Sequence, residues 1–136
     1  MTDCIFCKLR DGKIPSAKIY EDDKSICFLD ISPISPGHAL LIPKKHSETI
    51  MSADDEDLKH LILVTKKLSP AIMKATGATG LNIGVNNHKS SGQVVFHTHF
   101  HLIPRHDTDG LRHWPQGKYN DGEMNKWAEK IKKQIQ

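Results

Sequence analysis

Three histidines, His97, His99 and His101, stand at every second position inside a run of β-branched and aromatic residues that extends from 94 to 105. Such neighbours favour a β-strand, and alternate side chains of a strand share one face. The sequence therefore predicts three imidazoles on one side of a strand and the intervening apolar side chains on the other. Two imidazoles in such a row can reach one metal ion or one phosphate group, whereas the simpler interpretation is a surface stripe of histidines.

A second group with chemical potential is the C-x-x-C pair Cys4 and Cys7. Such a pair is a redox couple, half of a metal site, or neither. A redox couple usually opens a helix that follows a strand, and this pair instead lies near the N-terminus, which favours half of a zinc site. The third cysteine, Cys27, stands in an apolar run and is interpreted as an ordinary buried thiol.

Size and charge restrict the class of protein. The 136 residues fit a single domain over 1–136, and the net charge is only +3, from 19 Lys and Arg against 16 Asp and Glu. Because no long basic run is present, we expect no nucleic-acid partner, although small phosphates stay possible ligands. The sequence shows neither a signal peptide at its start nor an apolar run of membrane-spanning length, so we expect a cytoplasmic protein without a membrane partner.

The elements that must position the histidines follow from periodicity and turn residues. A short helix is expected over 5–9, strands over 18–20, 25–29, 38–43 and 81–85, and the histidine strand after the polar loop 86–93. A side-chain cap near Ser52 and an acidic first turn begin a long amphipathic helix that runs to about Ala75, closes at Gly77 and contains Pro70 as a possible kink. A last helix is expected over 123–135. This order of elements indicates an α+β fold with an antiparallel sheet.

Four segments, in the same order, resemble a known family. They are C-x-x-C at 4–7, F-L-D-I-S-P at 28–33, G-H-A-L-L-I-P-K-K-H at 37–46 and N-N-H-K-S-S-G-Q-V-V-F-H-T-H-F-H-L-I-P-R at 86–105. Together they resemble the histidine triad (HIT) superfamily of nucleotide hydrolases and transferases, and within it the branch of small homodimeric nucleoside phosphoramidases with an N-terminal C-x-x-C. The resemblance implies a HIT-like fold, a five-stranded antiparallel sheet with helices packed on one face, and a homodimer.

The resemblance also implies chemistry at the α-phosphorus of a nucleotide. His99 is the implied nucleophile, which forms a nucleotidyl-histidine that water hydrolyses to release the nucleoside monophosphate, with AMP preferred. An imidazole attacks only when it is unprotonated and its other N–H is held, and a backbone carbonyl is the expected acceptor. His101 is expected to donate to a phosphate oxygen. Gln93 and Asn86 match family positions that hydrogen-bond the phosphate or the leaving group.

A purine nucleotide substrate needs a ribose site and a base site. The resemblance assigns the ribose hydroxyls to Asp30, because a carboxylate accepts from two neighbouring O–H groups. The alternative for Asp30 is a turn residue that bonds its own backbone. The base slot is assigned to five apolar residues, each of which is equally compatible with plain core: Ile5, Phe6, Leu9, Ile14 and Leu29.

A structural zinc ion (Zn²⁺) is implied by a further likeness to the related uridylyltransferases. Its ligands here would be Cys4, Cys7, His46 and His97. Two thiolates and two imidazoles form a closed tetrahedral set with no open position for water, so the metal would brace the site rather than activate water. The alternative is a reduced pair of thiols without metal.

Two positions depart from the family pattern. Val94 stands where the phosphoramidases often have a serine or threonine that bonds phosphate, and His88 replaces a usual glycine; residues 107–121 match no motif.

The alternative substrate is a dinucleoside polyphosphate. Two other classes also stay open, namely a metallohydrolase in which all three triad histidines bind one catalytic zinc, and a nucleotide-binding protein without turnover.

Overall fold

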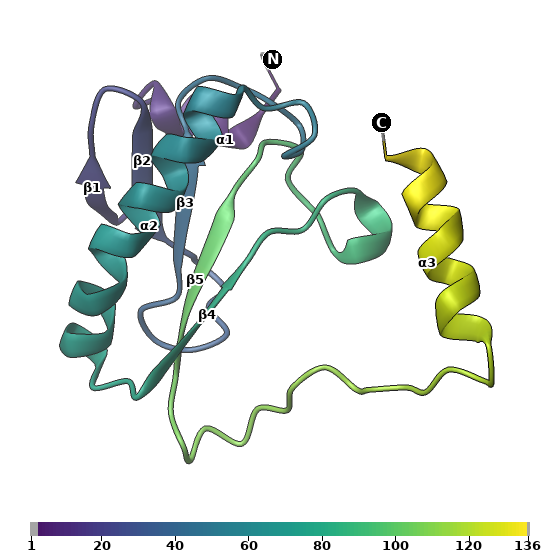
Figure 1. Ribbon diagram of the computed structural model, residues 1–136. Helices are drawn as coiled ribbons and strands as arrows, with labels where there is room; N and C mark the ends of the chain where they lie inside the picture. The colour runs from purple at the N-terminus through teal and green to yellow at the C-terminus, as the bar shows by residue number, and fades with distance from the viewer. Residues whose placement is uncertain (1–2, 136) are drawn as a thin grey trace.

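The computed structural model describes residues 3–135, and its centre is one five-stranded antiparallel sheet in the order β1-β2-β3-β5-β4 (Figure 1). The strands are β1 (Lys18–Glu21), β2 (Ser25–Leu29), β3 (Ala39–Pro43), β4 (Gly80–Gly84) and β5 (Phe100–Arg105). Each neighbouring pair is antiparallel. The predicted α+β fold with a five-stranded antiparallel sheet is therefore confirmed.

Within residues 3–135, three α-helices and one 3₁₀ turn accompany the sheet: α1 (Ile5–Arg10), α2 (Asp55–Thr76), α3 (Glu123–Gln134) and η1 (Lys89–Ser91). The long helix α2 begins after Asp54 and ends at Gly77, whose φ of 71° closes the last turn in the left-handed conformation. Pro70 lies inside α2 without ending it. The expected side-chain cap does not form, because the Ser52 hydroxyl donates to the Thr49 carbonyl instead.

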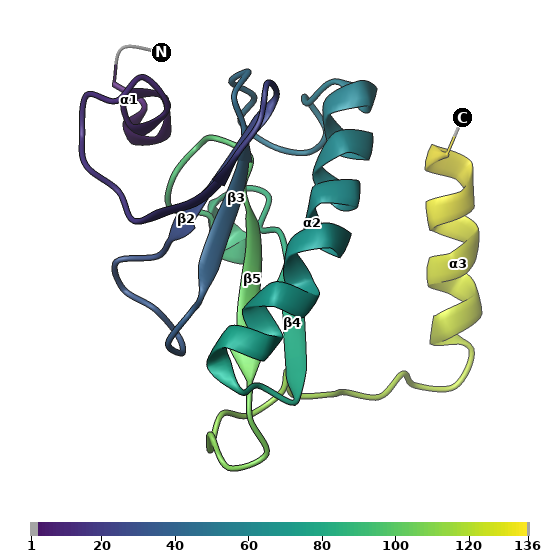
Figure 2. The same cartoon turned by 90° about the vertical axis from the view of Figure 1, so that its left-hand side faces the viewer.

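The strand β3 is buried along its whole length, so its alternating side chains need cover on both faces. On one face they join the α2-side core, which comprises Cys27, Ala39, Leu41, Leu61, Val64, Leu68, Ile72 and Leu102. On the other face they join the α1-side core, which comprises Phe6, Leu9, Ile26, Phe28, Leu40 and Ile42. The expectation that the helices pack on one face is thus corrected, since α1 and α2 lie on opposite sides of the sheet (Figure 2).

The histidine strand is shorter than predicted. β5 begins at Phe100, so only His101 of the triad lies in the ladder, opposite Leu40 of β3. The preceding segment pairs with a loop instead, because the Thr98 N–H donates to the Ser47 carbonyl at 2.7 Å. His97 and His99 therefore lie outside the sheet ladder, with His97 at the end of a bend over 95–97.

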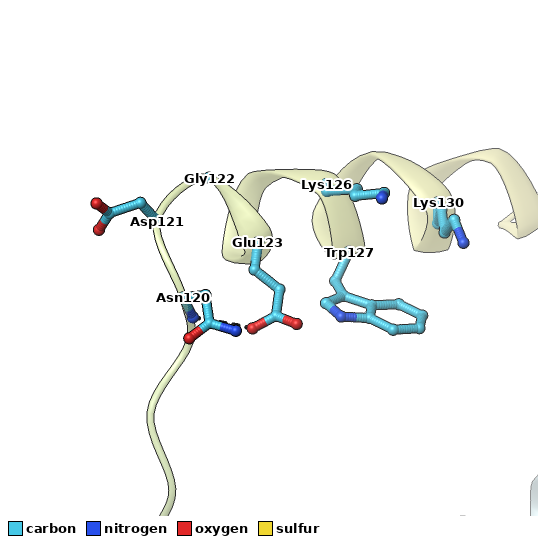
Figure 3. A pocket seen from close by; sticks show the side chains of 7 residues that line it. All are labelled: Asn120, Asp121, Gly122, Glu123, Lys126, Trp127 and Lys130. Atoms are coloured by element: carbon cyan, nitrogen blue, oxygen red, sulfur yellow. Dashed lines mark hydrogen bonds between the residues drawn. The ribbon is translucent and has the colours of Figure 1, made fainter.

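The C-terminal helix α3 stands apart from the sheet (Figures 1 and 2). No residue of α3 is buried, and Met124, Trp127 and Ile131 expose an apolar stripe along it. A surface hollow of about 390 Å³ at its first turns is lined by this one segment alone, with Glu123 turned towards Asn120 and the Trp127 ring lying beside them (Figure 3). Among the described helices, none is long and apolar enough to cross a membrane.

Candidate active site

Two cysteines and two histidines that are distant in sequence meet at the start of α1. Cys4 is the N-cap residue of this helix and Cys7 lies within it, whereas His46 comes from the loop after β3 and His97 from the segment before β5. The Sγ atoms lie 3.4 Å (Cys4) and 3.6 Å (Cys7) from His97 Nδ1, Cys7 Sγ lies 3.4 Å from His46 Nδ1, and the two Nδ1 atoms are 3.1 Å apart. We call these four residues the cysteine cluster.

The cysteine cluster fits a zinc ion. Zn–S and Zn–N bonds of about 2.3 and 2.0 Å place tetrahedral ligand atoms roughly 3.3–3.8 Å from one another, close to the separations found here. His97 Nε2 donates to the Pro43 carbonyl at 2.8 Å, so the lone pair of Nδ1 faces the cluster. Burial lowers the pKa of His97 to about 4, which keeps the imidazole in the neutral form that binds metal.

The middle histidine of the triad is held by a backbone carbonyl, as expected from the sequence. His99 Nδ1 donates to the His97 carbonyl oxygen at 2.7 Å. Since Nδ1 carries the proton of a neutral ring, Nε2 presents a lone pair. Burial also lowers the pKa of His99, which favours this neutral form. The ring is therefore in the tautomer that a nucleophile needs.

His101 is oriented by His38, a residue that the sequence interpretation missed. The Ile34 N–H donates to His38 Nδ1 at 3.0 Å, so His38 carries its proton on Nε2 and donates it to His101 Nδ1 at 2.9 Å. His101 must then be protonated on Nε2, a buried atom with no hydrogen-bond partner among residues 3–135. We call this chain the histidine relay; it leaves one N–H donor free beside His99, whose ring centroid is 4.9 Å away.

The histidine relay argues against a second metal, although Asp30, His38 and His101 place ligand atoms close together. A metal on His38 Nε2 would move the proton of the neutral ring to Nδ1, against the Ile34 N–H. Burial lowers the pKa of His101 to about 4 and also lowers that of His38, so both rings are neutral. In the sequence His38 stands directly before a fully apolar strand and within the segment 37–46 that resembles the family, and these were the signals that could have found it.

Asp30 lies at the edge of this group. Its Oδ1 accepts from the Ser32 N–H at 2.8 Å, which is the turn contact considered as its alternative role. Its Oδ2 lies 3.8 Å from His38 Nε2, beyond hydrogen-bond distance. One carboxylate oxygen is therefore engaged by the backbone and the other faces the histidine relay, and the assignment to ribose stays a prediction.

Gln93 and Asn86 occupy different environments. The Gln93 amide is buried and donates to the Glu48 and Val95 carbonyls at 2.6 and 3.1 Å, while its Oε1 accepts from the His88 N–H at 2.7 Å. These bonds use both of its donor hydrogens, so Gln93 braces the loop 86–93 in this structure. Asn86 is half-buried and lines the same cavity as His101.

The five residues assigned to a base slot do not share one surface. Phe6 and Leu9 are buried in the α1-side core with Ile14 against them, whereas Leu29 packs against the α2-side core. Leu29 is turned away because consecutive residues of β2 point to opposite faces. Ile5 is half exposed and lines a hollow of about 400 Å³ beside Cys4 and His46, where Val94 is 83% exposed.

A larger cavity of about 930 Å³ adjoins His101, and we call it the His101 cleft. Its walls come from β4, β5, the loop that contains Asn86, and residues 111–115. The last segment, with Arg112, His113 and Trp114, was not recognised in the sequence because no motif marks it. It places basic and aromatic side chains in the wall of the same cavity that His101 lines.

Comparison with known proteins gives the family. The HIT domain model matches residues 11–108, and this chain belongs to the HIT domain family. It is 39% identical over 138 residues to an adenosine 5'-monophosphoramidase, HNT1, of Candida albicans, covering 97% of this chain and 91% of that protein. It is 45% identical over 109 residues to an adenylylsulfatase, HINT3, of Arabidopsis thaliana, covering 80% of this chain and 55% of that protein.

Solved structures agree with this membership. The crystal structure of SMU.412c from Streptococcus mutans has a TM-score of 0.93 and 41% identity, over 100% of this chain and 87% of that one. A zinc-bound histidine triad family protein from Mycobacterium smegmatis has a TM-score of 0.78 and 33% identity, over 86% and 85% of the two chains. The HIT-like fold is thereby confirmed, and the predicted nucleotide hydrolase is confirmed at the level of the family.

Proposed function

We propose that the protein hydrolyses nucleoside 5'-phosphoramidates, or related compounds with a leaving group on the α-phosphorus, and releases the nucleoside monophosphate, preferably AMP. The observation that carries this proposal is the pair of fixed tautomers: His99 offers a free Nε2 lone pair, and His101 offers a free Nε2–H beside it. The Candida relative, named an adenosine 5'-monophosphoramidase, supports the choice of substrate.

The chemistry takes two displacements at phosphorus. His99 Nε2 attacks the α-phosphorus, the P–N bond to the leaving amine breaks, and the amine departs with a proton taken from solvent, which the attacking water returns in the second step. His101 Nε2–H donates to a phosphate oxygen, where charge increases in the transition state. Water then attacks phosphorus, the bond to His99 breaks, and the nucleoside monophosphate leaves with the imidazole restored. Asn86 lines the cavity next to His101 and is proposed to hydrogen-bond the phosphate. Gln93 is proposed to do the same once its amide has released one of the two backbone carbonyls to which it donates.

The metal has a separate part in this proposal. Cys4, Cys7, His46 and His97 would hold a structural zinc ion, whose two thiolate and two imidazole ligands leave no position for water. The triad histidines also divide between groups: His97 belongs to the cysteine cluster, His101 to the histidine relay, and His99 to neither. This division opposes the alternative of one catalytic zinc on all three histidines.

A dinucleoside polyphosphate is the second candidate substrate. The volume of the His101 cleft, about 930 Å³, and the presence of Arg112 and Trp114 in its wall favour a leaving group that carries phosphate and a second base.

We propose also that the protein works as a cytoplasmic homodimer. The exposed apolar stripe of α3 supports an assembly of chains, and light scattering measures its mass.

The test is release of AMP from adenosine 5'-phosphoramidate by the wild type and by His99→Ala, with zinc content measured on both samples. We expect turnover by the wild type, a loss of at least about 1,000-fold in the variant, and the same zinc content. Binding of AMP by the wild type without turnover would instead indicate a nucleotide-binding protein. Loss of zinc together with activity in His99→Ala would favour the metallohydrolase.

A further inference from the structure

Phe6 connects the cysteine cluster to the nucleophile. It stands on the first turn of α1 between Cys4 and Cys7, and its side chain is only 7% exposed. Its ring makes edge contacts with two triad histidines, with centroids 6.0 Å from His97 and 5.2 Å from His99. No base slot is needed to explain a ring that is already enclosed by protein.

The orientation of His99 depends on packing as well as on hydrogen bonding. Its one side-chain hydrogen bond to the described part of the chain, from Nδ1 to the His97 carbonyl, holds a single atom of the ring. The ring is also in contact with Phe6 at an interplanar angle of 88° and with His101 at 60°, with centroids 5.2 and 4.9 Å away. A planar ring enclosed in this way has little freedom to turn about its Nδ1 hydrogen bond.

The helix that carries Phe6 is anchored at both ends. At its start the Cys4 thiol accepts from the Cys7 N–H at 3.4 Å, and both thiols belong to the cysteine cluster. At its end Arg10 Nη1 donates to the Lys44 carbonyl at 2.6 Å. Phe6 is therefore held in place by the anchoring of its helix, independently of its contact with His99.

We propose that Phe6 is a positioning residue for the reaction, because its ring sets the plane of the His99 imidazole and so the direction of the Nε2 lone pair. The inference rests on the proposed function, in which His99 is the nucleophile. It differs from the base-slot assignment of Phe6, since a positioning residue changes the rate of the chemical step and a slot residue changes the binding of substrate.

The test compares Phe6→Leu with Phe28→Leu, a matched change in the same core at a ring that pairs with Phe6 but forms no aromatic ring pair with a triad histidine among residues 3–135. Each protein is measured for kcat and KM on adenosine 5'-phosphoramidate, for zinc content, and by nitrogen NMR of its histidine rings. For Phe6→Leu we expect kcat about 10- to 100-fold lower, KM within about twofold, unchanged zinc, and His99 signals broadened from the single Nδ1–H tautomer. For Phe28→Leu we expect kcat within about twofold and unchanged His99 signals.

Several outcomes overturn the proposal. A higher KM at unchanged kcat in Phe6→Leu would make Phe6 a base-slot residue. An equal fall of kcat in Phe28→Leu would indicate general loosening of the core. Loss of zinc from Phe6→Leu would show that the substitution acts through the metal site. Phe6→Met serves as a second variant where Phe6→Leu does not fold. If the wild type itself does not turn over substrate, the proposed function fails, and the NMR comparison still decides whether Phe6 orders the His99 ring.

Discussion

At the residue scale, the chemistry of His101 is set by a neighbour 63 positions earlier in the chain, His38. His101 has two nitrogens, and only the one that His38 leaves protonated can donate to a phosphate. His38 is in turn fixed by the Ile34 N–H, a backbone group that can only donate. The Ile34 N–H thus fixes the tautomer of His38, and His38 in turn fixes which nitrogen of His101 carries the proton.

Removal of His38 tests this relay. We expect His38→Ala to lower kcat about 10- to 100-fold with a smaller change in KM, because His101 loses the donor that fixes its tautomer. His60→Gln is the control, since His60 is a half-buried histidine that bonds Asp22 and takes no part in the histidine relay. Steady-state kinetics give kcat and KM for both variants at a temperature below the melting point of each. Full activity of His38→Ala would refute the histidine relay.

Backbone strain is concentrated at His88. Its φ of 73° and ψ of 161° lie in a region that only glycine occupies without cost. We expect His88→Gly to raise the free energy of unfolding by about 1 kcal/mol, and the melting temperature by a few degrees, whereas His88→Ala, which keeps Cβ, brings no such gain. Thermal unfolding followed by circular dichroism makes the comparison. Equal melting temperatures for the two variants would contradict the assignment of strain.

At the element scale, most of the architecture was predictable, and its failures have physical causes. The bounds of β2 and the end of α2 at Gly77 match the prediction, because a strong apolar run and a left-handed glycine are local signals. The extent of β5 was wrong, since the Thr98 N–H pairs with the Ser47 carbonyl, and no local pattern reveals so distant a partner. The cover of the second sheet face by α1 also depends on tertiary contacts, here those of Phe6 and Leu9.

Asp22 joins the β1–β2 turn to α2. Burial opposes its charge, but hydrogen bonds from the Lys24 N–H, the Tyr20 hydroxyl, His60 and Ser25 outweigh burial and hold the pKa of Asp22 well below its ordinary value of 3.8. A carboxyl whose pKa is lower in the folded protein stabilises the fold at pH above its unfolded value. That stabilisation is lost as the pH falls below about 3.8 towards the folded value.

We therefore expect Asp22→Asn to reduce the free energy of unfolding at pH 7 by about 1–3 kcal/mol. The reason is that the amide places an NH₂ donor where one carboxylate oxygen has two hydrogen-bond partners. The difference from the wild type should shrink as the pH is lowered from 4 towards 2. Urea unfolding at a series of pH values gives this dependence, with Asp23→Asn at the exposed neighbouring position as the control. A difference that is constant with pH would show that charge is not involved.

At the scale of the whole molecule, the site joins segments that are distant in sequence. The cysteine cluster was predicted residue by residue, because its four ligands lie within recognised motifs, and the structure brings all four together. His38 was given no role although it lies within the recognised segment 37–46, because its hydrogen bond to His101 depends on the fold, and residues 111–115 were not predicted because a cavity wall leaves no motif. Leu29 was placed in one slot with Phe6, but it packs against the α2-side core, because consecutive residues of β2 point to opposite faces of the sheet.

Removal of metal should be visible in thiol chemistry. With zinc bound we expect none of the three cysteines to react with iodoacetamide at pH 8, and after chelation we expect two alkylations, at Cys4 and Cys7. Cys27 stays unreactive as an internal control, because burial raises its pKa to about 12 and its side chain is inaccessible. Peptide mass spectrometry locates the modified residues. Equal reaction with and without chelator would show that the pair holds no metal.

The central claim is that His99 carries the nucleotide during the reaction. The most direct measurement mixes the wild type with adenosine 5'-phosphoramidate, quenches within one turnover under mildly alkaline denaturing conditions, and locates any adenylyl group by peptide mass spectrometry. We expect an adduct on the peptide that contains residues 97–101, assigned by fragmentation to His99 and absent from His99→Ala. Turnover without any adduct, or an adduct on another residue, would contradict it.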